Sequence, residues 1–119
     1  MLIHGKERKF KLTVGAAIEI AALCPDKDLR NIGAVLDDTA TLAESTDLTA
    51  GIIVALNRGY EQARSYEEPG YAADPITRDE ILSLDTKALV SLRDEAFAAF
   101  LADSQVTVEA EPAKKKGQI

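Results

Sequence analysis

The sequence predicts an α+β domain that is predominantly α-helical, with an N-terminal β-hairpin packed on four to five helices and a disordered C-terminal tail. Hydrophobic residues make up 46% of the 119-residue chain, and aromatic residues amount to only 5%. Alanine is frequent and favours helix, and apolar residues recur at helical spacing over most of the chain. At this length we expect one globular domain at residues 1–103, with helices from about residue 14, followed by a flexible tail at residues 104–119.

The beginning of the chain shows the two-residue alternation that is typical of strands. Gly5 supplies the backbone freedom that a tight turn needs, so we expect a hairpin at about residues 1–12. Arg8, Phe10 and Leu12 share one face of the second strand, with Phe10 and Leu12 directed toward the core. A two-stranded ribbon is marginally stable alone, so the hairpin should pack on a helix or pair with another chain.

The first two helices are predicted from their boundaries and their apolar spacing. Thr13 is a favourable N-cap for a helix that Cys24-Pro25 ends, because the residue before proline avoids the α region. This helix is apolar nearly all round, so we expect it at the centre of the fold. A second helix begins after Asp26 or Asp28 and ends either at the acidic pair that follows it or near residue 42. Its apolar stripe is Leu29, Ile32, Val35 and Leu36.

The third helix has the clearest amphipathic pattern in the chain. Polar residues 45–47 provide N-capping groups before it. Its apolar residues, spaced by three or four positions, are Leu48, Ile52, Ile53, Leu56, Tyr60 and Ala63. Gly51 and Gly59 each cost about 1 kcal/mol against alanine in a helix, although Gly59 could instead permit close helix packing.

Turn and capping signals organise the rest of the chain. Pro69-Gly70 marks a turn within the main loop, which we expect at residues 67–75. Thr77 and Glu80 match a capping box, so a short helix should follow. Asp85 or Thr86 caps a last helix that ends at about residue 102. Its inward residues are expected to be Leu89, Leu92, Ala96, Phe97, Phe100 and Leu101.

The charge distribution argues against nucleic-acid binding as the main function. The net charge is −6, and the basic residues are divided between the hairpin and the last six residues. A charged edge strand more often blocks unwanted strand pairing than it binds phosphate. No nucleic acid partner is therefore expected from the hairpin cluster of Lys6, Arg8, Lys9 and Lys11. No apolar run approaches the roughly 20 residues of a membrane span, and no signal peptide opens the chain, so we expect a cytoplasmic protein without membrane contact.

No residue pattern indicates a catalytic, metal or cofactor site, so we expect a protein that is not an enzyme. His4 is the single histidine, and it lies in the predicted turn without a second ligand at metal-binding spacing. Cys24 follows an apolar helix, so a buried small hydrophobe is favoured over a reactive thiol. The acidic residues occur as adjacent pairs, which do not share a helix face. Solvated faces and helix N-termini explain them better than a metal site does.

The order of the elements, together with particular residues, resembles the tail assembly chaperones of long-tailed bacteriophages and prophages. Residues 2–12 look like the family's opening ribbon with its Gly-Lys turn, and residues 14–20 look like the Gly-Ala helix that follows it. Residues 52–61 are similar to the family's middle helix. Residues 76–81 resemble its later helix start, with threonine followed three residues on by glutamate. The resemblance spans most of residues 1–103 and consists of structural signatures without catalytic residues.

The resemblance implies a non-enzymatic chaperone that binds the tape measure protein and helps to recruit tail tube subunits around it. Such proteins act in the cytoplasm of the bacterial host cell and are absent from the finished virion. Many are made in two forms, the longer one by programmed ribosomal frameshifting near the end of the short one. Lys114-Lys115-Lys116-Gly117 is compatible with an adenine-rich slippery sequence, so this chain would be the short form.

A chaperone for an elongated helical partner needs apolar contact surface, and helix-in-groove contact is its natural mode. The candidate surfaces are the excess apolar faces of the first and last helices. The expected partner-binding residues lie late in the last helix and at the basic tip of the tail: Phe97, Phe100, Leu101, Lys114, Lys115 and Lys116. The alternative for these residues is ordinary core and a solvated terminus. The unpaired hairpin edge, or a brief strand at Val106 and Val108, could pair with another chain and suggests a homo-oligomer. The alternative function is a small regulatory or antitoxin-like protein whose basic hairpin contacts nucleic acid.

Overall fold

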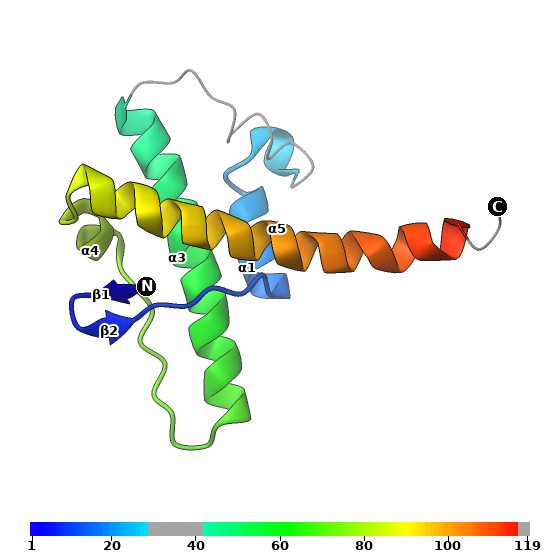
Figure 1. Cartoon of the computed structure of the whole chain (residues 1–119), viewed down its shortest axis with the longest axis horizontal. Helices are drawn as coiled ribbons and strands as arrows, with labels where there is room; N and C mark the ends of the chain where they lie inside the picture. The colour runs from blue at the N-terminus through cyan, green and yellow to red at the C-terminus, as the bar shows by residue number, and fades with distance from the viewer. Residues whose placement is uncertain (29–41, 117–119) are drawn as a thin grey trace.

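The structure is a computed structural model that describes residues 1–28 and 42–116. Within these ranges a two-stranded antiparallel hairpin precedes four α-helices and one 3-10 turn, so the prediction of a mostly helical protein with a small N-terminal hairpin is confirmed (Figure 1). The elements are β1 (Leu2–Ile3), β2 (Lys6–Glu7), α1 (Val14–Ala21), η1 (Pro25–Lys27), α3 (Leu42–Glu67), α4 (Arg78–Leu82) and α5 (Thr86–Lys116). The second helix predicted from residue 29 lies outside the described residues.

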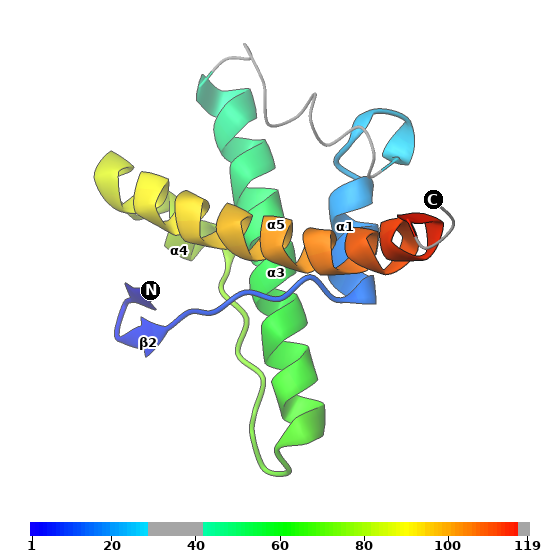
Figure 2. The same cartoon turned by 45° about the vertical axis from the view of Figure 1, so that its right-hand side comes forward.

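Helix α3 is the element on which the others pack. Helix α1 runs beside it, α5 crosses it and α4 contacts it (Figures 1 and 2). The extended segment 8–13 crosses α3 on its way from the hairpin to α1, and the loop 68–77 returns along α3 toward α4. Two segments without regular secondary structure therefore lie against the same helix.

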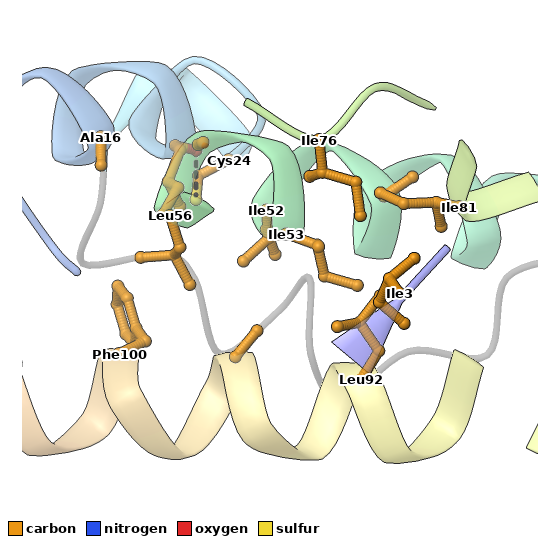
Figure 3. Packing of buried hydrophobic residues seen from close by; sticks show 14 residues of the cluster. Ile3, Ala16, Cys24, Ile52, Ile53, Leu56, Ile76, Ile81, Leu92 and Phe100 are labelled. Carbon is orange, nitrogen blue, oxygen red and sulfur yellow. Dashed lines mark hydrogen bonds between the residues drawn. The ribbon is translucent and has the colours of Figure 1, made fainter. Parts of the chain in front are cut away.

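The core lies between α3 and the elements around it. Leu92 and Phe100 point from α5 toward Ile3 and Leu56, and Ile76 and Ile81 approach from the loop and α4 (Figure 3). The buried hydrophobic residues are Ile3, Ala16, Ile20, Cys24, Ala50, Ile52, Ile53, Ala55, Leu56, Ile76, Ile81, Leu92, Ala96 and Phe100. Phe100 is the single aromatic member of this set, as the low aromatic content of the sequence predicted.

The hairpin is tighter and shorter than expected. His4 and Gly5 both have positive φ, at 48° and 82°, which is the signature of a two-residue hairpin turn whose twist suits the flanking strands. Leu2 pairs with Glu7 and Ile3 with Lys6. Arg8 N still donates to Met1 O over 2.8 Å, and beyond Arg8 the chain leaves the ribbon and finds hydrogen-bond partners on α3. Lys11 N, for example, donates to Leu56 O over 3.1 Å.

The predicted helix caps at Thr13 and Thr77 are confirmed. Thr13 Oγ1 accepts from Ala16 N over 3.1 Å, and Thr77 and Glu80 form a complete capping box. The structure also decides between the two candidates for the last helix. Asp85 Oδ1 accepts from Ala88 N over 2.7 Å, so Asp85 is the N-cap of α5.

Two other helix boundaries differ from the prediction. Helix α1 ends at Ala21, before Cys24-Pro25, and a 3-10 turn occupies the residues that follow. Helix α3 begins at Leu42, so the predicted capping cluster at residues 45–47 lies inside the helix. Residues 42–44 are leucine, alanine and glutamate, which are among the strongest helix formers, and they extend the helix upstream of the polar cluster.

The C-terminal end also differs from the prediction. Helix α5 continues through Lys116, whereas we expected it to end near residue 102, with a structureless tail or a brief strand at Val106 and Val108. Once a helix has nucleated, each further residue adds one hydrogen bond, so a packed first half can propagate into residues without amphipathic spacing. A segment without apolar periodicity can therefore still be helical. The flexibility expected for residues 104–119 stays a prediction.

Helix α1 is not central, in contrast to the expectation from its apolar sequence. It packs on one side of α3 through Ala16 and Ile20, which are buried. Val14 and Ile18 lie on its opposite side and are 81% and 66% exposed. A helix that is apolar all round has no periodic signal to show which face is packed.

Gly59 permits the close approach of α3 to the segment that leads into α1, as the sequence suggested. A Cβ atom at Gly59 would lie 2.7 Å from Lys11 O, 2.8 Å from Thr13 Oγ1 and 3.3 Å from Ala16 Cβ. The nearest of these atoms belongs to the backbone, which cannot rotate away as a flexible side chain can. The glycine is therefore required by packing and not by backbone conformation.

Substitution Gly59→Ala is expected to lower the free energy of unfolding by about 1–3 kcal/mol, because the added methyl group overlaps the Lys11 carbonyl. Urea denaturation of the full chain measures this change. The matched control is Gly15→Ala on α1, where the nearest neighbouring atom is Thr13 Oγ1 at 3.9 Å. That substitution should raise the free energy of unfolding by up to about 1 kcal/mol through helix propensity. Equal effects of the two substitutions would contradict the packing role of Gly59.

Candidate partner-binding surface

The most concentrated polar chemistry lies on one side of α3, where Asn57 and Glu61 are 0% and 1% exposed. Residues four apart on a helix point in the same direction, and we call these two the polar pair of α3. Asn57 Nδ2 donates to Lys9 O over 2.9 Å, while Asn57 Oδ1 accepts from Ile76 N over 2.7 Å. One amide side chain therefore joins the N-terminal segment and the return loop.

Glu61 joins the same two segments through a single oxygen atom. Its Oε1 accepts from the Tyr71 hydroxyl over 2.6 Å, from Asp74 N over 2.9 Å and from Lys6 Nζ over 3.3 Å. Burial opposes ionisation of this carboxyl, but the hydrogen bonds from Tyr71, Asp74 and Lys6 outweigh it and hold the pKa of Glu61 below its ordinary value. A carboxylate that is held ionised by internal donors is a poor general acid. The polar pair therefore holds two segments of the chain against α3.

The basic hairpin cluster is divided by the fold. Arg8 is 3% exposed and donates through Nη1 to Asn57 Oδ1 over 3.3 Å and to the Asp74 carbonyl. Its Nη2 lies 3.4 Å from Glu80 Oε2. Lys6 forms ion pairs with Glu61 and Asp74, which are 3.3 and 3.4 Å away. Two of the four cations thus bind internal groups, and an external basic surface here has only Lys9 and Lys11, which are both exposed.

His4 lies in the hairpin turn, as predicted, and contacts α4. Its Nε2 is 3.0 Å from Ser83 Oγ, a spacing that superficially suggests a nucleophile and a base. However, the Ser83 hydroxyl donates to Glu80 O over 2.7 Å, so its proton is directed away from the imidazole. The contact joins the turn to the end of α4 and does not activate a serine.

The other candidate for chemistry in the sequence was Cys24, which is confirmed as a buried residue at 6% exposure. Burial raises the pKa of its thiol, and the neighbouring Asp28 adds to this effect. In residues 1–28 and 42–116, no three His, Cys, Asp or Glu side chains are grouped so that they could hold a metal ion. None of the helices in that part of the chain has an apolar stretch long enough to cross a bilayer.

The structure separates the predicted partner-binding residues from one another. Phe100 is 6% exposed and belongs to the core, which the sequence offered as the alternative to partner binding. Phe97 is half-buried and packs against the edge of the core. Leu101 was expected to point inward, but it is 53% exposed. The residues at 114–116 lie in the last turn of α5, at the end of the helix that is far from α3 (Figure 1).

The excess apolar face that the sequence indicated on the first helix is exposed on α1. Val14, Ile18 and Ala22 follow one another at intervals of four residues and are all exposed, and we call them the α1 stripe. Glu19 is the single charged residue in α1, and it forms an ion pair with Arg58 of α3. The α1 stripe is therefore an apolar face without an unpaired charge beside it on its own helix.

A groove of about 380 Å³ adjoins this stripe. It lies between α1 and the first half of α3, and it is lined by Ala22, Leu23, Ala50, Gly51 and Val54, with Glu19, Asp47 and Arg78 at its rim. Arg78 forms an ion pair with Asp47 across α4 and α3. Because Ala22 belongs to both the groove and the stripe, the apolar surface continues from one to the other.

Comparison with known proteins adds no relative to this description. No protein-family model matches the chain, and no curated protein or solved structure matches it. The candidate surface is therefore argued from the geometry of this chain alone.

The folded state should lose stability on acidification through Glu61. A carboxyl with a lowered folded pKa stabilises the fold fully above its ordinary pKa of 4.5, and this contribution is lost as the pH falls through the folded value. We expect Glu61→Gln to lower the free energy of unfolding at neutral pH by about 1–3 kcal/mol and to flatten its decline below pH 4.5. Urea denaturation across a pH series measures both effects.

The control for this experiment is Glu67→Gln, since Glu67 is exposed at the end of α3. Its free energy of unfolding should stay within about 0.5 kcal/mol of the unsubstituted chain at each pH. Identical pH profiles for Glu61→Gln and the unsubstituted chain would refute the role given to the polar pair.

Proposed function

We propose that this protein is a non-enzymatic tail assembly chaperone that binds the tape measure protein of a long-tailed bacteriophage and helps to recruit tail tube subunits. The observation that carries the proposal is the α1 stripe, where Val14 and Ile18 are 81% and 66% exposed on a helix whose opposite face, at Ala16 and Ile20, is buried. The resemblance in the order and signatures of the elements gives the partner. The protein would act in the cytoplasm of the bacterial host.

The stripe suits a helical apolar partner. Full burial of a valine or isoleucine side chain contributes roughly 1.5–3 kcal/mol, so a partner that covers both Val14 and Ile18 gains a substantial share of a useful affinity. Three positions at intervals of four match the ridge of an α-helix, so a second helix can lie along them. The groove beyond Ala22 can take a bulky apolar side chain from the same partner.

The regulatory or antitoxin-like alternative has less support. It needs a basic surface on the hairpin, where phosphate contacts would come from several cations. Lys6 and Arg8 instead bind Glu61, Asn57, Asp74 and Glu80. Lys9 and Lys11 are too few to form a basic stripe on a chain with a net charge of −6.

The chaperone proposal is tested by co-expression of the full chain with the tape measure protein from the same genome, followed by pull-down and size-exclusion chromatography. We expect a stable complex and a tape measure protein that stays soluble only when this chain is present. Ile18→Lys should weaken the complex at least tenfold, about 1.4 kcal/mol, because it places a charge in an apolar contact. Pull-down at graded concentrations measures this loss.

The matched control is Leu2→Lys on β1, since Leu2 is 65% exposed and Ile18 is 66% exposed. This variant should bind the tape measure protein as the unsubstituted chain does. A tape measure protein that aggregates in the presence of the chain would reject the chaperone proposal. Equal binding by Ile18→Lys and Leu2→Lys would instead show that the contact lies elsewhere on the protein.

A further inference from the structure

The hairpin and α4 lie on one side of α3, and α1 lies on the other side (Figures 1 and 2). The hairpin belongs to residues 1–10, and the return loop and α4 belong to residues 70–83. These two stretches are far apart in the sequence, and we call them together the outer unit. Their contacts with each other differ in kind from their contacts with the long helices.

Polar side chains connect the two stretches of the outer unit at several points. Arg8 Nη2 lies 3.4 Å from Glu80 Oε2 of α4, and Arg8 Nη1 donates to the Asp74 carbonyl of the return loop. At the hairpin turn, His4 Nε2 is 3.0 Å from Oγ of Ser83, the residue that caps the end of α4. The hairpin, the loop and α4 are therefore joined to one another and not only to α3.

The polar attachment of the outer unit to α3 depends on few side chains. In residues 1–28 and 42–116, no hydrogen bond between the outer unit and α3 joins two backbones. The polar pair makes these bonds, apart from an exposed ion pair between Arg78 and Asp47. The Met1 ammonium forms a second surface pair with Glu95 of α5. Because surface ion pairs contribute little in water, the polar pair carries most of the polar attachment.

The ends of the outer unit suit a hinged motion. Gly70 begins the second stretch with a φ of 92° and is exposed, so its backbone is free to rotate. The first stretch ends before Lys11, whose backbone is fixed to Leu56 O of α3 over 3.1 Å. Ser83 ends α4 and is also exposed. At each of these points a change of backbone angle leaves the long helices unaltered.

We propose that the outer unit opens from α3 and α5 as a single body, while α1, α3 and α5 stay folded, and that the polar pair holds it closed. Proteins open in such cooperative parts at a lower free energy than global unfolding requires. Ile3 and Ile76 of the outer unit belong to the same core cluster as Ile53 of α3 and Leu92 of α5 (Figure 3). Opening therefore uncovers apolar surface on both long helices, and this surface is available to a partner only in the open form.

Amide hydrogen exchange of the full chain, measured by NMR, tests this opening. The reporters are the backbone amides of Arg8, Ile76 and Ser83, whose hydrogen bonds do not involve Glu61. Glu61→Gln should accelerate the exchange of all three by the same factor, at least about fivefold, because they exchange through one opening. Tyr71→Phe removes one donor to Glu61 and keeps the carboxylate, so it should accelerate them by a smaller common factor.

The control is Ile20→Val on the packed face of α1, where Ile20 is 0% exposed. This contact persists in the open form, so the substitution should accelerate exchange in the middle of α3, at residues 52–56, at least about twofold and leave the three reporters unchanged. The proposal is overturned if Ile20→Val accelerates the reporters as much as it accelerates α3, since the chain would then open only as a whole. It is also overturned if Glu61→Gln accelerates the reporters by unequal factors or not at all.

Discussion

Two segments without regular secondary structure, residues 8–13 and 68–77, lie against α3, and their enclosed backbone groups must find hydrogen-bond partners. Among the residues that the structure describes, the short hairpin is the sole sheet, and neither segment continues it as a strand. The partners come from the polar pair of α3: Asn57 binds Lys9 O and Ile76 N, and Glu61 binds Asp74 N. Through these contacts a single helix positions the hairpin on one side and the approach to α4 on the other.

This arrangement fixes the positions of both segments. Removing the Glu61 carboxylate from water carries a desolvation cost, which the hydrogen bonds from Tyr71, Asp74 and Lys6 outweigh. The contacts around Tyr71 also hold the loop in position, since its ring lies 4.1 Å from the Arg64 guanidinium and 5.7 Å from Lys6 Nζ. Both cations lie near carboxylates that they bind, so the loop is held in one position by several weak, directional contacts.

The inward placement of the polar groups determines what remains on the outside for a partner. Arg8 and Lys6 bind α3 and the loop, so the hairpin presents little basic surface. Among the large apolar residues that remain exposed, Val14 and Ile18 share one face of α1, whereas others, such as Leu2 and Leu82, lie on different elements.

Much of the local structure followed from the sequence, because it depends on atoms within about four residues of one another. The caps at Thr13 and Thr77, the turn at His4-Gly5 and the apolar face of α3 are all of this kind. For the candidate surfaces, the sequence indicated the apolar face of the first helix but not which of its residues are exposed. In the last helix Phe100 is buried, as expected, whereas Leu101, expected to point inward, is 53% exposed.

Which side of an all-apolar helix is packed, and whether a charged residue such as Glu61 is buried, depend on neighbours that are distant in the sequence. Glu61 meets Lys6 across 55 positions, and the face of α1 is decided by the backbone contact that Gly59 permits. Periodicity and capping carry no information about such partners. The sequence by itself therefore determined the elements and their ends near a cap, whereas the tertiary structure decided which residues are enclosed and which remain free to bind.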